Sequence, residues 1–134
     1  MTDKELVVKH LEMTQGVINR LAHNSFLVKG WSMAILGAAI LFIEKNSSGS
    51  AYLILAFSVP IVSFWVLDGY FLWQERLFRG IYNDVRVKET TDFKMDIPAQ
   101  LNKPKNQWHH AIFSKTLLLF YGSELSFLLI VFFI

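Results

Sequence analysis

The 134-residue chain contains no cysteine, which excludes disulfide bonds and thiolate metal sites. Proline occurs three times, and charged residues make up 18% of the chain. Charges are nearly absent from three long stretches, which consist of aliphatic and aromatic side chains. Hydrophobic residues reach 53% of the chain, above the roughly 45–50% of an ordinary soluble domain. The excess is concentrated in these stretches, and this clustering is typical of a membrane protein.

The three apolar stretches cover residues 26–43, 51–73 and 111–134. A helix needs about 20 apolar residues to cross the hydrocarbon core of a bilayer, and each stretch is long enough. We therefore predict an all-α integral membrane protein with three transmembrane helices, forming a single domain over residues 1–134. Residues 1–25 are polar and lack the apolar core and cleavage site of a signal peptide, so we expect no removable leader.

Lysine and arginine are distributed unevenly between the segments that flank these stretches. Twelve of the 13 lie in residues 1–29 or 74–115, and one, Lys45, lies in the turn at residues 44–50. Positively charged segments tend to stay in the cytoplasm. We therefore predict an inner (plasma) membrane protein with a cytoplasmic N-terminus and middle segment, and with Ser48 and the C-terminal Ile134 outside.

Two of the predicted cytoplasmic segments have helical periodicity of their own. Residues 1–25 read as an amphipathic helix whose apolar side chains recur at spacings of four and three. Residues 74–88 continue the second span as a helix that projects roughly 20 Å beyond the membrane. The two segments are antiparallel neighbours, so we predict that they pack together through their apolar faces. The predicted contact joins Leu11, Ile18 and Leu21 to Phe78, Ile81 and Val85.

Residues 89–106 break the helical pattern. Phe93, Met95 and Ile97 alternate with charged residues, while Pro98 and Pro104 exclude a helix interior. We predict a cytoplasmic connecting loop that contains a short extended segment. Long loops of this kind are often functional, which makes the three apolar side chains candidate contacts for a cytoplasmic protein partner.

Glu124 is the most informative polar residue, because it lies near the middle of the third span. A charge at that depth costs about 2.5–3.5 kcal/mol, and ionisable groups inside membranes are candidates for functional sites. The alternative is a protonated carboxyl with a structural role, bonded to Ser123, Ser126 or the backbone of a neighbouring helix, and an interface also offers the Tyr121 hydroxyl. In both cases we predict that Glu124 faces the protein interior or a subunit interface, not lipid.

Pro60, Ser63 and Asp68 are the other polar candidates, and all three belong to the second span. Pro60 frees one backbone carbonyl at about the depth expected for Glu124, with Ser63 nearby, so a polar spot inside the membrane is one reading. A proline that the helix simply tolerates is the other. Asp68 lies at the cytoplasmic end of the span, where we expect an ion pair. Its candidate partners are Arg20, Lys29 and Lys115.

No catalytic or cofactor motif is present in the sequence. The GxSxG, P-loop and GxGxxG patterns do not occur, and the four histidines lack the spacing of a helical metal site. The basic middle segment is mixed with acidic residues and lies beside a membrane, so anionic lipids explain it better than nucleic acid does. We therefore predict a protein that is not an enzyme, that uses no metal or cofactor, and that does not bind nucleic acid.

The runs HLEMTQGVINRLAHNSFLVKGWSMAIL (residues 10–36) and FWVLDGYFLWQERLFRGIYNDVR (residues 64–86) resemble a group of small uncharacterised bacterial membrane proteins. Their layout of a cytoplasmic helix, a membrane hairpin and a returning helix is similar to that of the SLATT-type effectors of bacterial conflict (anti-phage) systems. The resemblance implies pore formation or membrane disruption upon an immune signal. The third span departs from the two-span plan of those effectors.

Two functions are consistent with these features. The first is a homo-oligomeric membrane effector or channel-type subunit, since three spans are too few to enclose a pore and several copies must assemble. The second is a non-catalytic membrane anchor or regulatory subunit, which binds a larger cytoplasmic protein through residues 89–106.

Overall fold

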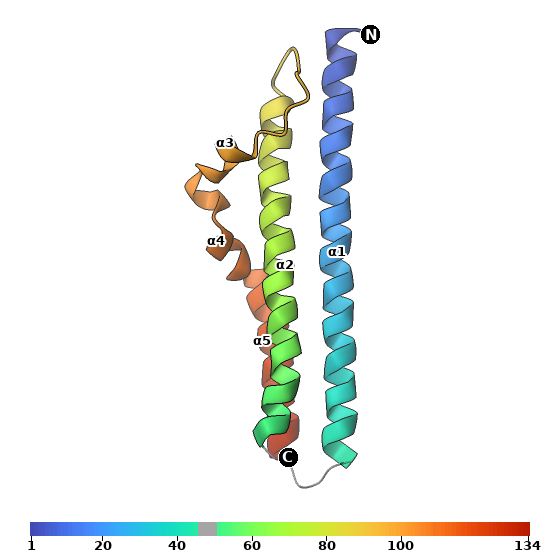
Figure 1. Ribbon diagram of the computed structural model, residues 1–134, viewed down its shortest axis with the longest axis vertical. Helices are drawn as coiled ribbons and strands as arrows, with labels where there is room; N and C mark the ends of the chain where they lie inside the picture. Colours follow the sequence, from blue (N-terminus) through green and yellow to red (C-terminus); the bar gives the residue numbers. More distant parts are fainter. Residues whose placement is uncertain (46–50) are drawn as a thin grey trace.

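The chain folds into three long helices and a compact helical connector (Figure 1). The computed structural model describes residues 1–45 and 51–134, and in these residues it contains no β-strand. The predicted position of Ser48 lies outside the described residues. The long helices are α1 (Asp3–Lys45), α2 (Ala51–Val85) and α5 (Lys115–Phe133). The connector holds α3 (Ile97–Leu101), a 3-10 turn η1 (Pro104–Asn106) and α4 (Trp108–Ile112).

α1 is one uninterrupted helix of 43 residues, about 64 Å long. It unites the predicted segments 1–25 and 26–43, and Gly30 does not break it. Its buried side chains recur at spacings of three and four from Val7 to Ile18 and from Val28 to Ile43, with half-buried Leu21 and Ser25 between them, the pattern of helices that pack nearly parallel along a seam. The polar and the apolar part of α1 therefore contact the other helices through one continuous face.

α2 runs antiparallel to α1 and continues beyond its apolar stretch to Val85, with Pro60 inside the helix. Near the N-terminus of α1, Val7, Ile81 and Val85 form a buried cluster on which Leu11 and Phe78 pack. Ile18 is buried farther along the seam, and Leu21 is half-buried. The helix segments before the first apolar stretch and after the second therefore lie together.

The connector is more helical than the sequence predicts. Residues 97–101 form α3, where a loop with an extended segment was expected. Asp96 caps this helix by accepting a hydrogen bond from the Ala99 amide at 3.2 Å. Pro98 lies at the start of the helix, where its missing N–H removes no helical hydrogen bond. The expectation of a loop is therefore wrong at residues 97–101, because a proline is excluded from the interior of a helix but tolerated in its first turn.

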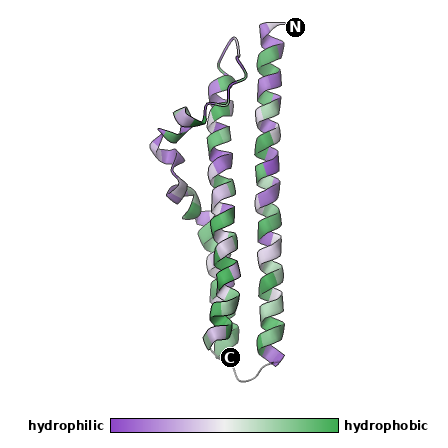
Figure 2. Ribbon diagram, in the orientation of Figure 1, coloured by the Kyte–Doolittle hydropathy of each residue, from purple (hydrophilic) through white to green (hydrophobic). Residues whose placement is uncertain are grey.

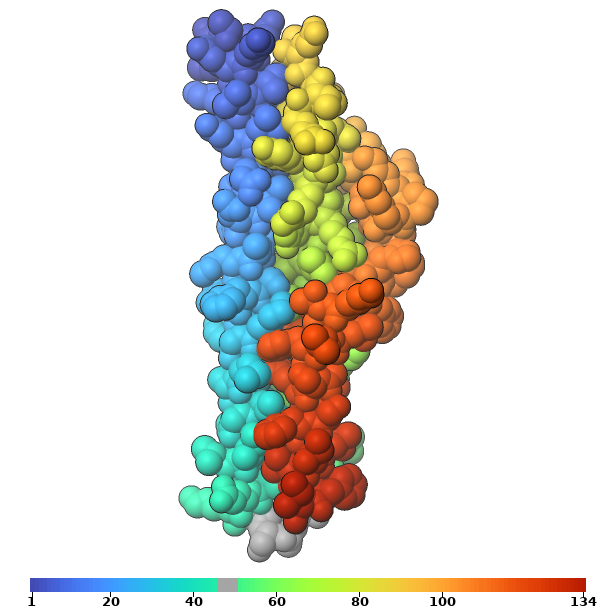
Figure 3. All heavy atoms as spheres, turned by 180° about the vertical axis from the view of Figure 1, so that it is seen from behind, coloured from blue at the N-terminus to red at the C-terminus, as the bar shows by residue number. Residues whose placement is uncertain are grey.

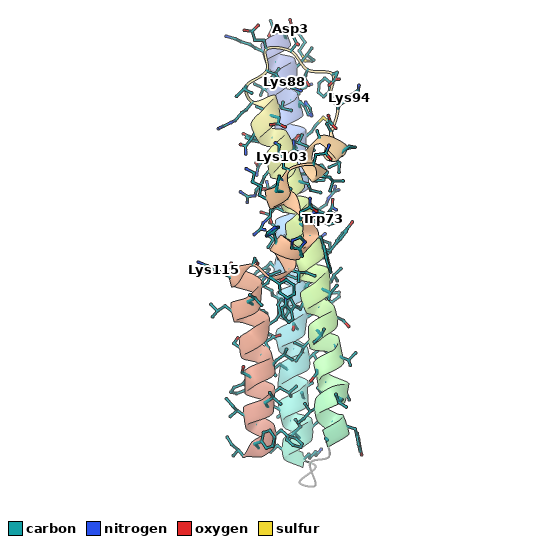
Figure 4. All side chains as sticks on the ribbon, turned by 90° about the vertical axis from the view of Figure 1, so that its left-hand side faces the viewer. Asp3, Trp73, Lys88, Lys94, Lys103 and Lys115 are labelled. Carbon is teal, nitrogen blue, oxygen red and sulfur yellow. The ribbon has the colours of Figure 1, made fainter. Side chains whose placement is uncertain are left out.

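α5 begins at Lys115, four residues later than the predicted span at residues 111–134. Ser114 has extended backbone angles and caps α5 by accepting a hydrogen bond from the Leu117 amide, so α4 and α5 are separate helices. α5 packs in the groove between α1 and α2, as Figure 3 shows from behind. Figure 4 shows Lys115 at the start of α5 and Trp73 beside the connector, where its indole donates to the Asn106 carbonyl at 2.9 Å.

Hydropathy divides the molecule into two halves (Figure 2). We call the half that holds α5 the apolar half, and the half that holds the connector and the N-terminus the polar half. α1, α2 and α5 are each long and apolar enough to cross a membrane. In their most apolar segments no more than 28% of the residues are buried, so most of these side chains are exposed or only half-buried in the single chain. Such a surface needs lipid or further protein to cover it.

Candidate functional site

Asp68 is the centre of a buried polar cluster that joins all three long helices. Its carboxylate is fully buried, and Lys29 Nζ of α1 forms an ion pair with Oδ2 at 2.5 Å. The Ser25 hydroxyl of α1 donates a hydrogen bond to Oδ1, and the Tyr121 hydroxyl of α5 donates one to Oδ2 at 2.9 Å. Of the three ion-pair partners expected from the sequence, Lys29 is the one that the fold brings to Asp68.

Helix periodicity explains why these side chains meet. Ser25 and Lys29 are four residues apart, so they share a face of α1, and Lys29 Nζ donates to Ser25 Oγ at 2.9 Å. The Lys29 side chain remains 23% exposed, so the ion pair lies at the edge of the buried cluster. Asp68 therefore has one ion pair and two hydroxyl donors. A buried carboxylate requires compensation of this kind.

Trp65 packs the end of α4 and the start of α5 against the same cluster. Its ring stacks on Tyr121, with centroids 6.3 Å apart and an angle of 10° between the planes. Its indole N–H donates to the Ile112 carbonyl at 3.0 Å. Ile112 in turn lies on Gly69, where a Cβ would overlap the Ile112 side chain. The glycine next to Asp68 is thus required for the close approach of α4.

Glu124 is buried between α5 and α1, with 3% of its surface exposed. The Ser32 hydroxyl donates to Oε2 at 2.5 Å, whereas Oε1 has no hydrogen-bond partner among the described residues. Glu124 lies nine residues after Lys115, about 14 Å along a helix of about 28 Å, so it is half way along α5. Ser123 and Ser126 bond to backbone carbonyls of their own helix. The partner that the fold supplies is therefore Ser32.

Pro60 and Ser63 are placed apart from this carboxyl. The Ser63 side chain is exposed, and its hydroxyl donates to the Val59 carbonyl of its own helix at 2.8 Å. Asp68 and Tyr121 are in contact and mark one level along the bundle. Glu124 is three residues from that level on α5 and Pro60 eight residues on α2, a separation of about 7 Å along the helix axes. The expectation of equal depth is thus corrected.

The polar line from Lys29 to Glu124 ends half way through the apolar half. Beyond it the three helices meet through a purely hydrophobic cluster that includes Ala39, Ile61 and Leu128, each fully buried. Close-packed aliphatic side chains exclude water and ions. Within a single chain, the buried polar side chains therefore stop at Glu124, and the contacts beyond it are apolar.

The predicted partner loop packs largely on the protein itself. Met95 and Ile97 pack against the buried cluster of Val7, Ile81 and Val85. Phe93, with a positive φ of 59°, remains 37% exposed and lies over the His10 ring, with centroids 5.5 Å apart. The main structural role of this segment is therefore to cover the apolar cluster between α1 and α2 in the polar half.

His10 anchors the same segment to α1. Its Nδ1 lies 2.6 Å from Thr91 Oγ1, and its ring is buried. Burial lowers the pKa of His10, the nearby Lys88 lowers it further, and Asp92 opposes the shift. The neutral imidazole is thus the form that suits this contact. The sequence alone does not place His10 in this seam, because a histidine is compatible with either face of an amphipathic helix.

Several polar residues of the fold carry no signal in the sequence. Ser32, Gln100 and Asn106 are buried, yet each stands in a stretch without a motif. The described residues contain no group of three or more His, Cys, Asp or Glu side chains that could hold a metal ion. Ser25 and Asp68 are in contact, but Asp68 is already paired with Lys29 and no histidine completes a catalytic arrangement there.

No protein-family model, curated protein or solved structure matches the chain. Its function has to follow from the chemistry of its own side chains. The strongest chemical feature is the set of buried Asp68, Tyr121 and Glu124 with half-buried Lys29, because ionisable groups are rare inside apolar helix bundles.

Proposed function

We propose that the chain is a subunit of a homo-oligomeric membrane channel or membrane-disrupting effector. The three long helices cross the inner (plasma) membrane, with the polar half in the cytoplasm and the C-terminus outside. The distribution of lysine and arginine supports this orientation, since 12 of the 13 lie on the proposed cytoplasmic side or at its interface. The likeness in layout to SLATT-type effectors of anti-phage defence points to the same class of function.

The observation that carries this proposal is the unpartnered Glu124 Oε1. A carboxyl that served only to join α1 and α5 would have both oxygens satisfied, because an unsatisfied polar atom in an apolar bundle is costly. Glu124 has Ser32 at one oxygen and none of the described residues at the other. This favours a group that takes part in a second state of the protein, in which Oε1 meets a cation, water or a neighbouring subunit.

Assembly is supported by the outer face of α1. Gly30, Ala34 and Ala38 recur every four residues on its exposed surface, and Gly37 lies beside them. A Cβ at Gly30 or Gly37 would have nothing within 4 Å in the protomer. Small residues at this spacing let membrane helices approach closely. We infer that this face joins neighbouring copies of the chain.

In this proposal the pore opens when α5 moves relative to α1. In the arrangement described here the carboxyl is held against Ser32 and the route beyond it is closed by Ala39, Ile61 and Leu128. Displacement of α5 relative to α1 in each copy would release Glu124 toward the symmetry axis. A ring of carboxyl groups at mid-depth then favours the passage of cations.

The test is cation flux through vesicles that contain the purified protein. Glu124→Gln keeps the hydrogen-bonding shape but removes any charge, so we expect a multimer of unchanged size with reduced cation flux and reduced cation selectivity. Ser126→Ala is the matched control, because Ser126 is exposed on the same helix and bonds only to its own backbone. Equal flux through the wild type and Glu124→Gln, or vesicles as tight as empty ones, would contradict the channel function.

A second candidate is the membrane anchor or regulatory subunit. It is favoured by the apolar side chains that stay uncovered at the tip of the polar half, where Val87 is 76% exposed and Phe93 37%. Met95 and Ile97 contribute less to such a surface, since they pack inward. An anchor predicts a single copy that purifies together with another protein, and Val87→Ser with Phe93→Ser would release that protein.

A further inference from the structure

A basic cleft of about 390 Å³ lies between α2 and the connector, well separated from Glu124. Its walls carry four positively charged side chains, which come from α2 and from the segment around η1. They are Arg76, Arg79, Lys103 and Lys105. Three amide side chains complete the lining: Asn83, Gln100 and Asn106. The function proposed above makes no use of this cleft.

The floor of the cleft is built from buried, ordered amides. Gln100 is 1% exposed, and its Nε2 donates to Asp84 Oδ2 at 2.5 Å. Asn106 is 6% exposed, and its Nδ2 donates to the Gln100 carbonyl at 3.1 Å. Gln100 lies directly on Gly80, where a Cβ would overlap its side-chain amide. These contacts hold the connector at a fixed distance from α2, so the cleft is preformed.

The charges in the cleft are only partly compensated. Arg79 pairs with Glu75 at 2.6 Å, and Lys103 lies 3.6 Å from Asp84. Arg76 and Lys105 have no carboxylate partner in residues 1–45 and 51–134. Like charges that converge on one cleft repel each other, and a bound anion removes the repulsion. A second sign of incompleteness is Gln100 Oε1, a buried acceptor that lacks a partner among the described residues.

We propose that this cleft binds a phosphate group, carried either by an anionic lipid headgroup or by a soluble phosphate ester. The Arg76 guanidinium, which has no carboxylate partner among the described residues, suits the bidentate recognition of phosphate, and the lysines add charge without a fixed geometry. The amides at the floor supply neutral donors.

The position of the cleft suits a lipid source. Arg76 lies eight residues beyond Asp68 on α2, about 12 Å farther into the polar half. If the three helices cross the membrane as proposed, Arg76 and Lys105 lie at the level of the headgroups on the cytoplasmic side, where basic clusters bind anionic lipids. Only the choice of source depends on that placement, because the cleft itself is formed within one chain.

The experiment measures binding to the purified full chain in nanodiscs, at about 0.15 M salt to suppress unspecific attraction. One arm compares retention of phosphatidylglycerol in nanodiscs that contain this lipid with retention in discs of phosphatidylcholine alone. The other arm titrates glycerol 3-phosphate and inorganic phosphate in phosphatidylcholine discs. Cleft-dependent binding in the first arm alone assigns a lipid headgroup, and binding in the second assigns a soluble ester.

The test variant is Arg76→Gln with Lys105→Gln, and the matched control is Arg86→Gln with Lys88→Gln, which removes the same charge outside the cleft. We expect the test variant to weaken binding about tenfold or more, and the control about twofold or less. Arg76→Lys should lose affinity as well, because it keeps the charge but not the planar fork. Equal losses in the two double variants, or no binding in either arm, would overturn the proposal. Circular dichroism checks that each variant keeps its helices.

Discussion

At the scale of single residues, Asp68 makes more interhelical contacts than any other polar side chain described above. Asp68 forms an ion pair with Lys29 of α1, accepts a hydrogen bond from Tyr121 of α5, and is fully buried. We predict that Asp68→Ala lowers the free energy of unfolding by about 3 kcal/mol or more, because it strands Lys29 and the Tyr121 hydroxyl. Glu75→Ala breaks a pair whose Arg79 partner is 62% exposed, and should cost less than about 1 kcal/mol. Thermal unfolding in detergent compares the two, and similar losses would refute the ranking.

His10 predicts a dependence on pH in the polar half. Its pKa is lowered by burial, so the docked segment around Thr91 disfavours the protonated ring. The contact makes its full contribution to stability above the pKa of His10 in the unfolded chain, about 6.5. This contribution is lost as the pH falls from that value toward the lower pKa of His10 in the folded protein.

The hydrogen-exchange rates of the backbone amides of residues 90–95, corrected for intrinsic rates, should therefore increase as the pH is lowered from about 7.5 to 5.5. The increase should vanish in His10→Asn and persist in His23→Asn, since His23 is exposed. An unchanged pH response in His10→Asn would assign the effect to other groups.

The sequence predicted the buried carboxyls better than their partners. Glu124 and Asp68 stand out because a charge inside an apolar run is costly and needs a reason. Ser32 does not stand out, because a serine is common in apolar helices and its role depends on a contact 92 residues away along the chain. The cleft residues Gln100 and Asn106 were missed for the same reason.

At the scale of helices, two glycines of α2 control how closely the connector approaches. A Cβ at Gly69 would overlap Ile112, and one at Gly80 would overlap Gln100. We predict that Gly69→Ala and Gly80→Ala destabilise the protein by about 1–3 kcal/mol, as overpacking does. Gly16→Ala has open space and should be neutral or stabilising by up to about 1 kcal/mol. Destabilisation by all three substitutions would show that helix–connector contact is not the cause.

The long helices were predictable from periodicity, and the connector was not. The spacing of the apolar residues predicts the buried face of α1, and from this face follow the length of the helix and the helix on which it packs. The prediction of a loop at residues 89–106 gave Pro98 too much weight. The pair Asp96 and Pro98 is a signature of a helix start, and it marks α3 in the sequence once it is read that way.

At the scale of the whole molecule, the orientation in the membrane is open to direct test. We predict that a cysteine at Glu44 reacts with an impermeant thiol reagent added to intact cells, because Glu44 is exposed at the end of the apolar half. A cysteine at Thr90, exposed at the tip of the polar half, should react only after the cells are opened. The chain has no native cysteine, so each variant carries a single label. Labelling of both positions from outside would exclude the proposed topology.

The overall arrangement followed from the distribution of apolar and charged residues, whereas the assembly did not. Three apolar stretches give three long helices, and a polar segment between the second and third gives the connector. The number of copies depends on how the outer faces of α1, α2 and α5 fit one another. Nothing in the periodicity of a single chain determines that fit.

The mass of the protein in a lipid nanodisc tests the proposed function most directly, since a pore requires several copies. Light scattering coupled to chromatography should give a protein mass that is a multiple of the 15.5 kDa chain by two or more. Leucine at Gly30 and Ala34 should reduce that multiple, while Glu124→Gln should leave it unchanged. A 15.5 kDa protomer at every concentration, alone or bound to a different protein, would contradict the channel and favour the anchor.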